Sequence, residues 1–150
     1  MQFLHVALVL TLAVFQSRSD YVLVRSVVNG NTIVASNVGR VRLLGVDTPA
    51  PFDRDARDRL SGLVLNRWVR LEHEVGEGDT YNRHRAYVMT GDGTFVNAVI
   101  VRDGLARVPA RARLTRLAEL QRAEAEAQTF RRGMWGRTPQ VPRARYNKRP

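Results

Sequence analysis

The sequence of 150 residues contains no cysteine, so disulfide bonds are excluded and the fold must depend on its apolar core. It also contains no P-loop, no cluster of zinc ligands and no serine-nucleophile motif, which removes the usual signatures of three large enzyme classes. No internal repeat is present. These absences leave the motifs of a single small domain as the guide to function.

Long hydrophobic runs are missing except at the N-terminus, where the segment 3–15 is almost wholly apolar. This run has roughly the length of a secretory signal and is shorter than the stretch that spans a bilayer. Ser17-Arg18-Ser19 offers small residues for a signal peptidase, although the usual basic residues before the run are missing. We predict that residues 1–19 are a cleaved leader and that the mature protein is secreted or periplasmic, with no membrane span. An uncleaved anchor and an extra apolar strand are the alternatives.

Acidic residues are scarce: the chain has 14 of them against 24 basic residues, a formal net charge of +10 and a pI near 11.4. No acidic residue follows Gly133, so residues 137–150 are predicted to be a basic flexible tail. Such a tail binds polyanions in a salt-dependent way without reading sequence, and the alternative is a solvated tail with no specific partner. The charge therefore favours nucleic acid, DNA or RNA, as the partner.

Between the two ends, about 115 residues remain to form a core, which suits one small domain. The apolar content of 44% and the charged content of 25% are ordinary for a globular protein. We predict one domain over residues 20–136, present as a monomer.

The first half of this domain has the alternating apolar pattern of β-strands, and the second half has helical periodicity. Expected strands are 21–28, 32–36, 40–46, 67–74 and 85–90, and expected helices are 53–65, 96–102 and 114–130. A turn at Asn29-Gly30 and another at 37–39 join the first three strands into a meander. The predicted fold class is α+β, mainly β, with five strands and about three helices.

The most informative stretch runs from Val28 to Pro51. Arg42 lies in a run that alternates like a strand, so its guanidinium is held by rigid backbone, as a phosphate clamp requires. Asp47 and Thr48 follow the strand directly and precede a proline that cannot continue the ladder. They offer a carboxylate and free carbonyls at a strand end, which are oxygens that hard cations bind.

The chain resembles the staphylococcal nuclease (thermonuclease-like) family in five motifs that occur in the family's order over roughly residues 22 to 136. The motifs are Asn29-Gly30-Asn31-Thr32; Arg42 to Ala50; Tyr81-Asn82-Arg83; Val96-Asn97 with 101–106; and Glu124 to Ala127 with Gly133-Met134-Trp135. The resemblance implies that the five strands form an OB-type β-barrel.

It also implies site residues. Arg42 and Arg83 match the family's catalytic, phosphate-binding arginines, and Tyr81 matches a substrate-binding tyrosine. Asn31, Asp47 and the carbonyl of Thr48 match positions that bind a calcium ion. The substrate class that follows is DNA or RNA, hydrolysed at the phosphodiester bond.

The sequence differs from the family at the positions that bind the metal and activate water. The acids of the turn are replaced by Asn29 and Asn31, and the glutamate that activates water is replaced by Ala50. Calcium affinity rises with the number of anionic ligands, so metal binding should weaken. Each positioned catalytic group is worth about 10² to 10⁴ in rate, so activity should be weakened or lost. Two tyrosines that contact the nucleotide in the family are also replaced, by Ala110 and Ala112.

Two alternatives remain open. One is that Asp53 or Asp55 supplies a displaced carboxylate, but the favoured interpretation is that Asp53 is the N-cap of a helix with Asp55 in its first turn. The other alternative is that the whole domain is a non-catalytic OB-type nucleic-acid or polyanion-binding module. Trp68 and Trp135 are interpreted as core aromatics, and Glu124 as the acceptor of a structural hydrogen bond.

Overall fold

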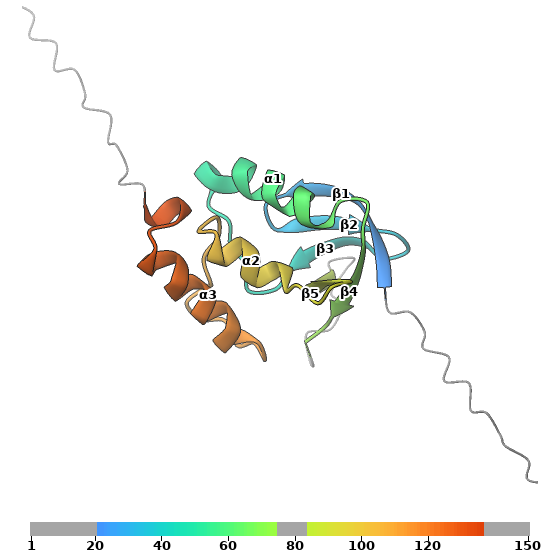
Figure 1. The fold of residues 1–150 in the computed structure, drawn as a ribbon. Helices are drawn as coiled ribbons and strands as arrows, with labels where there is room; N and C mark the ends of the chain where they lie inside the picture. Colours follow the sequence, from blue (N-terminus) through green and yellow to red (C-terminus); the bar gives the residue numbers. More distant parts are fainter. Residues whose placement is uncertain (1–20, 75–83, 137–150) are drawn as a thin grey trace, which may run out of the picture.

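The computed structural model describes residues 21–74 and 84–136 (Figure 1). The strands are β1 Tyr21–Asn29, β2 Thr32–Ala35, β3 Gly39–Leu43, β4 Trp68–Glu72 and β5 His84–Thr90. The helices are α1 Asp53–Val64, α2 Val96–Arg102 and α3 Leu117–Thr129, with single 3-10 turns η1 Ala50–Phe52 and η2 Gly133–Trp135. The predicted leader, the basic tail and the segment with Tyr81 and Arg83 lie outside the described residues, so those interpretations stay predictions.

The five strands form a closed barrel in the order β1-β2-β3-β5-β4. All neighbours are antiparallel except β3 and β5, which run parallel. Strand β1 pairs with β2 along one edge and with β4 along the other, and its register shifts twice against β2. Such bulges bend a strand and let a short sheet close on itself. The predicted five-stranded OB-type barrel with three helices is therefore confirmed.

The barrel interior is filled by the inward-facing residues of the alternating strands, among them Val24, Ile33, Val41, Val69 and Val88, all fully buried. Helix α1 packs against β1, α2 packs against β5, and α3 packs on α2 (Figure 1). Helices α1 and α2 thus lie against the barrel, and α3 lies on α2. None of the helices within 21–74 and 84–136 is long and apolar enough to cross a membrane.

The fully buried Asn97 in α2 ties three elements together. Its Oδ1 accepts a hydrogen bond from the Val88 N–H at 2.9 Å. Its Nδ2 donates to the carbonyl of Leu44 at 2.9 Å and, at 3.4 Å, to that of Ala86. This one amide therefore satisfies backbone groups of β5 and of the segment after β3, where the sheet ladder ends.

The 3-10 turn η2 packs against the C-terminal end of α2. Gly104 has a φ of +73°, and a Cβ at this position would collide with the Arg132 carbonyl. The N–H of Met134 donates to the Gly104 carbonyl at 2.9 Å. The backbone of η2 therefore lies directly on the end of α2, and only glycine fits at residue 104.

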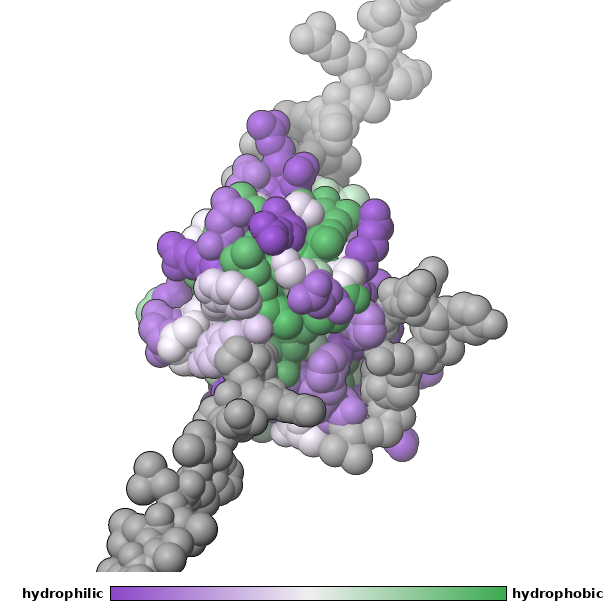
Figure 2. Space-filling view, turned by 90° about the vertical axis from the view of Figure 1, so that its right-hand side faces the viewer, coloured by the Kyte–Doolittle hydropathy of each residue, from purple (hydrophilic) through white to green (hydrophobic). Residues whose placement is uncertain are grey.

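The surface carries few large apolar side chains: Tyr21, Leu65, Trp68 and Phe130 are the exposed ones among the described residues. Figure 2 shows one face, on which an apolar area is bordered by hydrophilic residues. Trp68 is 59% exposed, so its interpretation as a core aromatic was wrong. Strand alternation turns it outward next to the buried Val69. Trp135 is partly buried in η2.

Candidate nucleic-acid interface

A groove of about 470 Å³ lies at the end of β3. We call it the arginine groove, and its charged lining residues are Arg42, Asp47, Arg85, Arg111 and Arg113. Its remaining walls are Leu43, Leu44, Gly45, Val46, Pro109, Ala112 and Leu114. The groove thus brings together two of the predicted site residues, Arg42 and Asp47, with three arginines that the sequence analysis did not select.

The sheet positions the first two arginines. Arg42 lies on the outer face of β3, between the buried Val41 and Leu43. The parallel register of β3 and β5 pairs Arg42 with Arg85, so the two residues are neighbours on adjacent strands. Only the strand order brings them together, because they are 43 positions apart in the chain (85 − 42).

Asp47 is placed by its backbone. Its N–H donates to the Arg107 carbonyl at 2.9 Å, and the Arg107 N–H donates to the Asp47 carbonyl at the same distance. Gly45 makes the turn before it with a φ of +67°, and a side chain there would meet Leu114 Cδ1 at 2.8 Å. Asp47 therefore lies not directly after a strand, since β3 already ends at Leu43, but in an isolated bridge with Arg107, and its carbonyl is not free as predicted.

The segment 109–114 carries Arg111 and Arg113 and is anchored at both ends. Before it, the Val108 N–H donates to Glu124 Oε1 at 2.9 Å, which confirms the structural role predicted for Glu124. After it, the Thr115 N–H donates to Glu74 Oε1 at 2.6 Å. Both arginines are exposed, and both line the groove together with Arg42 and Arg85.

Asn31 lies beside the groove, in the turn between β1 and β2. Its side chain is 8% exposed. Its Nδ2 donates to the Val46 carbonyl at 3.1 Å, and its Oδ1 accepts from the Thr32 hydroxyl at 3.0 Å. The amide therefore presents a hydrogen-bond donor, and not an oxygen, to the residue that precedes Asp47.

Ala50 occupies the position of the family's general base, and Asp53 is the nearby carboxylate that was considered as its substitute. Ala50 begins η1 and is exposed, and its methyl group cannot accept a proton. Asp53 is not an N-cap, which was a wrong prediction: the N-cap of α1 is Phe52, without a side-chain cap bond. Asp53 Oδ1 instead accepts from the Gly30 N–H at 2.9 Å, because α1 starts against the β1–β2 turn. Asp53 does not line the arginine groove, and Asp55 lies in the first turn of α1 as expected.

The sequence of residues 40–137 matches the staphylococcal nuclease homologue family. The chain belongs to the staphylococcal nuclease family. It is 35% identical over 135 residues to the thermonuclease of Staphylococcus intermedius, which covers 80% of this chain and 79% of that protein. It is 31% identical over 122 residues to the thermonuclease of Staphylococcus hyicus, covering 73% and 72%. It is 30% identical over 135 residues to the SPbeta prophage-derived endonuclease YokF of Bacillus subtilis, covering 80% and 45%.

The staphylococcal nuclease family is typically calcium-dependent, and the residues of this chain do not fit such an ion. Asn31 directs its N–H toward the Val46 carbonyl, and a cation needs oxygens there. Within 21–74 and 84–136 no group of three or more acidic or histidine side chains converges. Asp47 is the one anion of the predicted set, and the Thr48 carbonyl and its buried, unpartnered hydroxyl are neutral. Tyr81 and Arg83, the remaining predicted site residues, lie outside the described residues.

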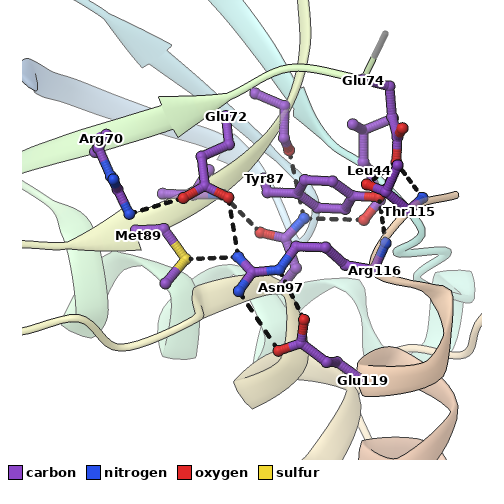
Figure 3. Close-up of polar contacts among 12 residues, drawn as sticks. Leu44, Arg70, Glu72, Glu74, Tyr87, Met89, Asn97, Thr115, Arg116 and Glu119 are labelled. Atoms are coloured by element: carbon purple, nitrogen blue, oxygen red, sulfur yellow. Dashed lines mark hydrogen bonds and ion pairs between the residues drawn. The ribbon is translucent and has the colours of Figure 1, made fainter. Parts of the chain in front are cut away.

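A polar network supports the segment that carries Arg111 and Arg113 (Figure 3). Glu74 accepts hydrogen bonds from the Tyr87 hydroxyl and from the N–H and hydroxyl of Thr115. Arg116 pairs with Glu72 at 3.1 Å and with Glu119 at 2.8 Å, and its guanidinium lies 4.2 Å from the centre of the Phe95 ring. The network joins β4 and β5 to the start of α3.

Glu74 makes the stability of this junction depend on pH. Burial raises the pKa of its carboxyl, but hydrogen bonds from Tyr87 and Thr115 lower it further, so the pKa lies below its usual range. A lowered pKa in the folded state means that the carboxylate stabilises the fold at pH values above the unfolded pKa of about 4.3. This stabilisation is lost as the pH falls through the folded pKa.

Glu74→Gln is therefore expected to lower the free energy of unfolding at pH 7 by about 1 kcal/mol, a small value because the site is partly exposed to water. The difference from the unmodified protein should shrink to nothing as the pH falls well below 4, where both side chains are neutral. Urea unfolding at several pH values measures it. Asp58→Asn, which neutralises an exposed carboxylate on α1, is the control and should change little. A Glu74→Gln effect that persists at low pH would contradict this account.

Proposed function

We propose that this protein binds the phosphodiester backbone of DNA or RNA in the arginine groove and that its hydrolytic activity is weakened or lost. The observation that carries the proposal is the convergence of Arg42 and Asp47 in one groove on the staphylococcal nuclease barrel. Two relatives are named thermonucleases and a third is named an endonuclease, which supports nucleic acid as the ligand.

The chemistry of binding follows from the arginines. A guanidinium presents a planar fork of N–H donors that matches two phosphate oxygens, and it stays charged at any relevant pH. Arg42 stands on a strand, so its backbone is already fixed before binding. Arg83 matches the second phosphate-binding arginine of the family. Together these groups hold a phosphate and favour the extra negative charge that develops during hydrolysis.

Two groups that hydrolysis needs are missing, a proton acceptor and an anionic ligand for the cation. Water attack needs a proton acceptor, and Ala50 supplies none. The family's cation would need a further anionic oxygen at residue 31, where the Asn31 amide donates instead. Asp47 alone keeps a carboxylate after β3. Substrate is therefore held, but the step that breaks the phosphodiester bond is slow.

A second function, binding without any turnover, is favoured by one observation. The Asn31 amide is hydrogen-bonded through both its nitrogen and its oxygen, so the turn is complete without a cation. In this case the protein is a nucleic-acid-binding module that keeps the nuclease barrel. The same experiment tests both candidates, because it measures binding and cleavage separately.

The Arg42→Ala variant is expected to bind a fluorescent oligonucleotide about tenfold or more weakly, because it loses charge-assisted hydrogen bonds to phosphate. Anisotropy in EDTA measures binding, and a gel assay with Ca²⁺ or with EDTA measures cleavage. Arg40→Ala is the matched control, since Arg40 is exposed on the same strand but does not line the groove. Equal losses in the two variants would refute the groove as the binding site. Rapid cleavage by the unmodified protein that stops with chelator would refute weakened hydrolysis.

A further inference from the structure

We propose that a second hollow, at the other end of β5 from the arginine groove, binds one unpaired base of a nucleic-acid strand and prefers bases that carry an exocyclic amino group. We call it the Trp68 pocket. It has a volume of about 290 Å³, and its lining includes Arg67, Trp68, Thr90, Asp92 and Thr94. The pocket and the arginine groove have no lining residue in common. The proposal therefore goes beyond the proposed function and depends on different residues.

Strand β5 separates the two sites. Arg85, near the start of β5, lines the arginine groove, whereas Thr90, the last residue of β5, lines the Trp68 pocket. The five residues between them (90 − 85) correspond to about 17 Å of strand. One nucleotide cannot fill both sites over that length. The Trp68 pocket is therefore a separate contact, for a base at another position of the bound strand.

The first group in the pocket is an aromatic ring. Trp68 is 59% exposed at the start of β4, and the next residue, Val69, is fully buried in the barrel. The backbone of Trp68 is paired with Leu23 of β1, so the ring stands on a fixed strand. Among the described residues, no aromatic ring or guanidinium stacks on it. A base can stack on such a ring, but single exposed apolar side chains are common, so the neighbouring groups decide its role.

The second group is a carboxylate. Asp92 is exposed in the turn after β5, where it accepts hydrogen bonds from the Thr90 hydroxyl and, at 3.2 Å, from the Thr94 N–H. Hydrogen bonds from Thr90 and Thr94 lower the pKa of the Asp92 carboxyl, so it is ionised at neutral pH. A carboxylate has about four acceptor positions. Over residues 21–74 and 84–136, Asp92 forms no ion pair. It can therefore accept an N–H from a ligand.

The carboxylate sets the preference among bases. Cytosine and adenine carry an exocyclic amino group that donates hydrogen bonds, whereas thymine has a carbonyl oxygen at the corresponding ring position. Acidic side chains accept from the amino group of cytosine in protein–DNA contacts. The same carboxylate repels a carbonyl oxygen. A base stacked on Trp68 with its polar edge toward Asp92 is therefore expected to be cytosine rather than thymine or uracil.

The third group is a cation for the phosphate of the same nucleotide. Arg67 is exposed, directly precedes Trp68 and lines the pocket. Its backbone is held on both sides, by bonds of 3.0 Å to the Val64 carbonyl and from the Val24 N–H. Other arginines of this chain are also without an ion pair, so Arg67 is distinguished by its place beside a ring and a carboxylate. A neutral sugar would gain nothing from Arg67, and the net charge of +10 also favours a polyanion.

The pocket is built before binding and has the size of one base. The Gly93 N–H donates to the Thr90 carbonyl at 3.0 Å, and the Thr90 N–H donates to the Thr94 carbonyl at 3.1 Å, so the turn that carries Asp92 is fixed. A fixed turn lowers the cost of ordering when a ligand binds. The volume of about 290 Å³ lies at the lower end of the range for small-molecule sites. It suits a single planar ring system.

The test compares oligo-dC with oligo-dU of equal length, because the two share the sugar and phosphates and have an amino group or a carbonyl oxygen at ring position 4. Each is titrated with the full-length protein in EDTA at neutral pH, and fluorescence anisotropy of the labelled oligonucleotide measures binding. We expect oligo-dC to bind about fivefold tighter or more. Asp92→Asn should bring the ratio close to one, because an amide offers both a donor and an acceptor.

The ring is tested separately. Trp68→Ala should weaken the binding of oligo-dC about fivefold or more, whereas Trp68→Phe keeps a flat ring and should retain most of the affinity. Leu65→Ala is the control, since Leu65 is an exposed apolar residue outside the pocket, and it should change affinity by less than about threefold. Oligo-dC should also quench the tryptophan fluorescence of the unmodified protein. This quenching should disappear in Trp68→Phe, because Trp135 is then the one remaining tryptophan.

The phosphate contact has its own matched pair. Arg67→Ala should weaken oligo-dC and oligo-dU by the same factor and reduce the slope of log K against log salt concentration by about 0.7. Arg57→Ala removes an exposed charge from α1, outside the pocket, and should reduce both the affinity and the slope by less.

The outcomes separate the Trp68 pocket from the arginine groove. Equal affinity for oligo-dC and oligo-dU, or a Trp68→Ala variant that behaves like Leu65→Ala, would overturn the proposal, and a loss of binding in Arg42→Ala would still support the proposed function. A preference for oligo-dC that depends on Trp68 and Asp92, in a protein that Arg42→Ala leaves unweakened, would support the pocket and refute the groove. Quenching of Trp68 by a neutral oligosaccharide but not by oligo-dC would assign the pocket to sugars and overturn the proposal.

Discussion

An Asn31→Asp/Ala50→Glu double variant is expected to cleave DNA in the presence of Ca²⁺ at least about 10²-fold faster than the unmodified protein. Glu at residue 50 would restore a proton acceptor at an exposed position with room for its side chain. Asp at residue 31 would place a second anionic oxygen beside Asp47, which raises the affinity for a hard cation. Initial cleavage rates with Ca²⁺ and with EDTA measure the gain.

The single variants are the controls for this experiment, because each restores one part only. Asn31→Asp removes the N–H that donates to Val46, so two oxygens would face each other across 3.1 Å without a proton between them. We expect this variant to be less stable in EDTA by about 1–3 kcal/mol and to regain stability when Ca²⁺ bridges the oxygens. A folded double variant that binds Ca²⁺ but cleaves no faster would show that the two replaced residues do not limit catalysis.

Asn97→Ala is expected to lower the free energy of unfolding by about 3–5 kcal/mol, a large part of the stability of a small domain. The change removes one acceptor and two donor contacts and leaves the Val88 N–H and the Leu44 carbonyl buried without a partner. Urea unfolding followed by circular dichroism measures the loss. Gln121→Ala, which removes an exposed amide from α3, should change stability by less than about 0.5 kcal/mol.

Asn97→Asp refines this prediction. The aspartate keeps the acceptor for Val88 but loses both donors and buries a charge, so it should be destabilising as well. Leu44 lines the arginine groove, so the surviving folded fraction of either variant should also bind oligonucleotides less tightly. An Asn97→Ala protein with nearly unchanged stability would show that water replaces the amide, and the role assigned to Asn97 would be wrong.

The sequence pattern predicted the elements of the fold but not their partners. Alternation identifies which residues of a strand face the core, and it placed all five strands within a few residues. It carries no information on which strand lies beside which, so the parallel pair β3–β5 and the pairing of Arg42 with Arg85 were not foreseen. Helix α3 begins at Leu117 and not at residue 114, because the Thr115 N–H donates to Glu74 from the preceding strand segment.

The candidate site was predicted in part for the same reason. Arg42 and Asp47 were found because they lie in one local motif, five positions apart in the sequence. Arg111 and Arg113 were missed because arginine is common throughout this basic chain, and only the tertiary fold selects those that line the groove. Asp53 was assigned to its own helix, yet a contact with Gly30, 23 positions earlier, competes for the carboxylate. Residues with a local role are predictable, and residues whose role is set by distant partners are not.

The contact of η2 with Gly104 has a consequence for the order in which the polypeptide acquires its structure. Since the Met134 N–H donates to the Gly104 carbonyl just after α2, this part of the domain cannot reach its final form until residues 133–135 have been synthesised. A nascent chain that ends before Gly133 would leave the Gly104 carbonyl without the Met134 N–H, and Gly104 without the backbone that packs on it. Packing at the end of α2 is therefore completed only by η2, the last element of the described residues.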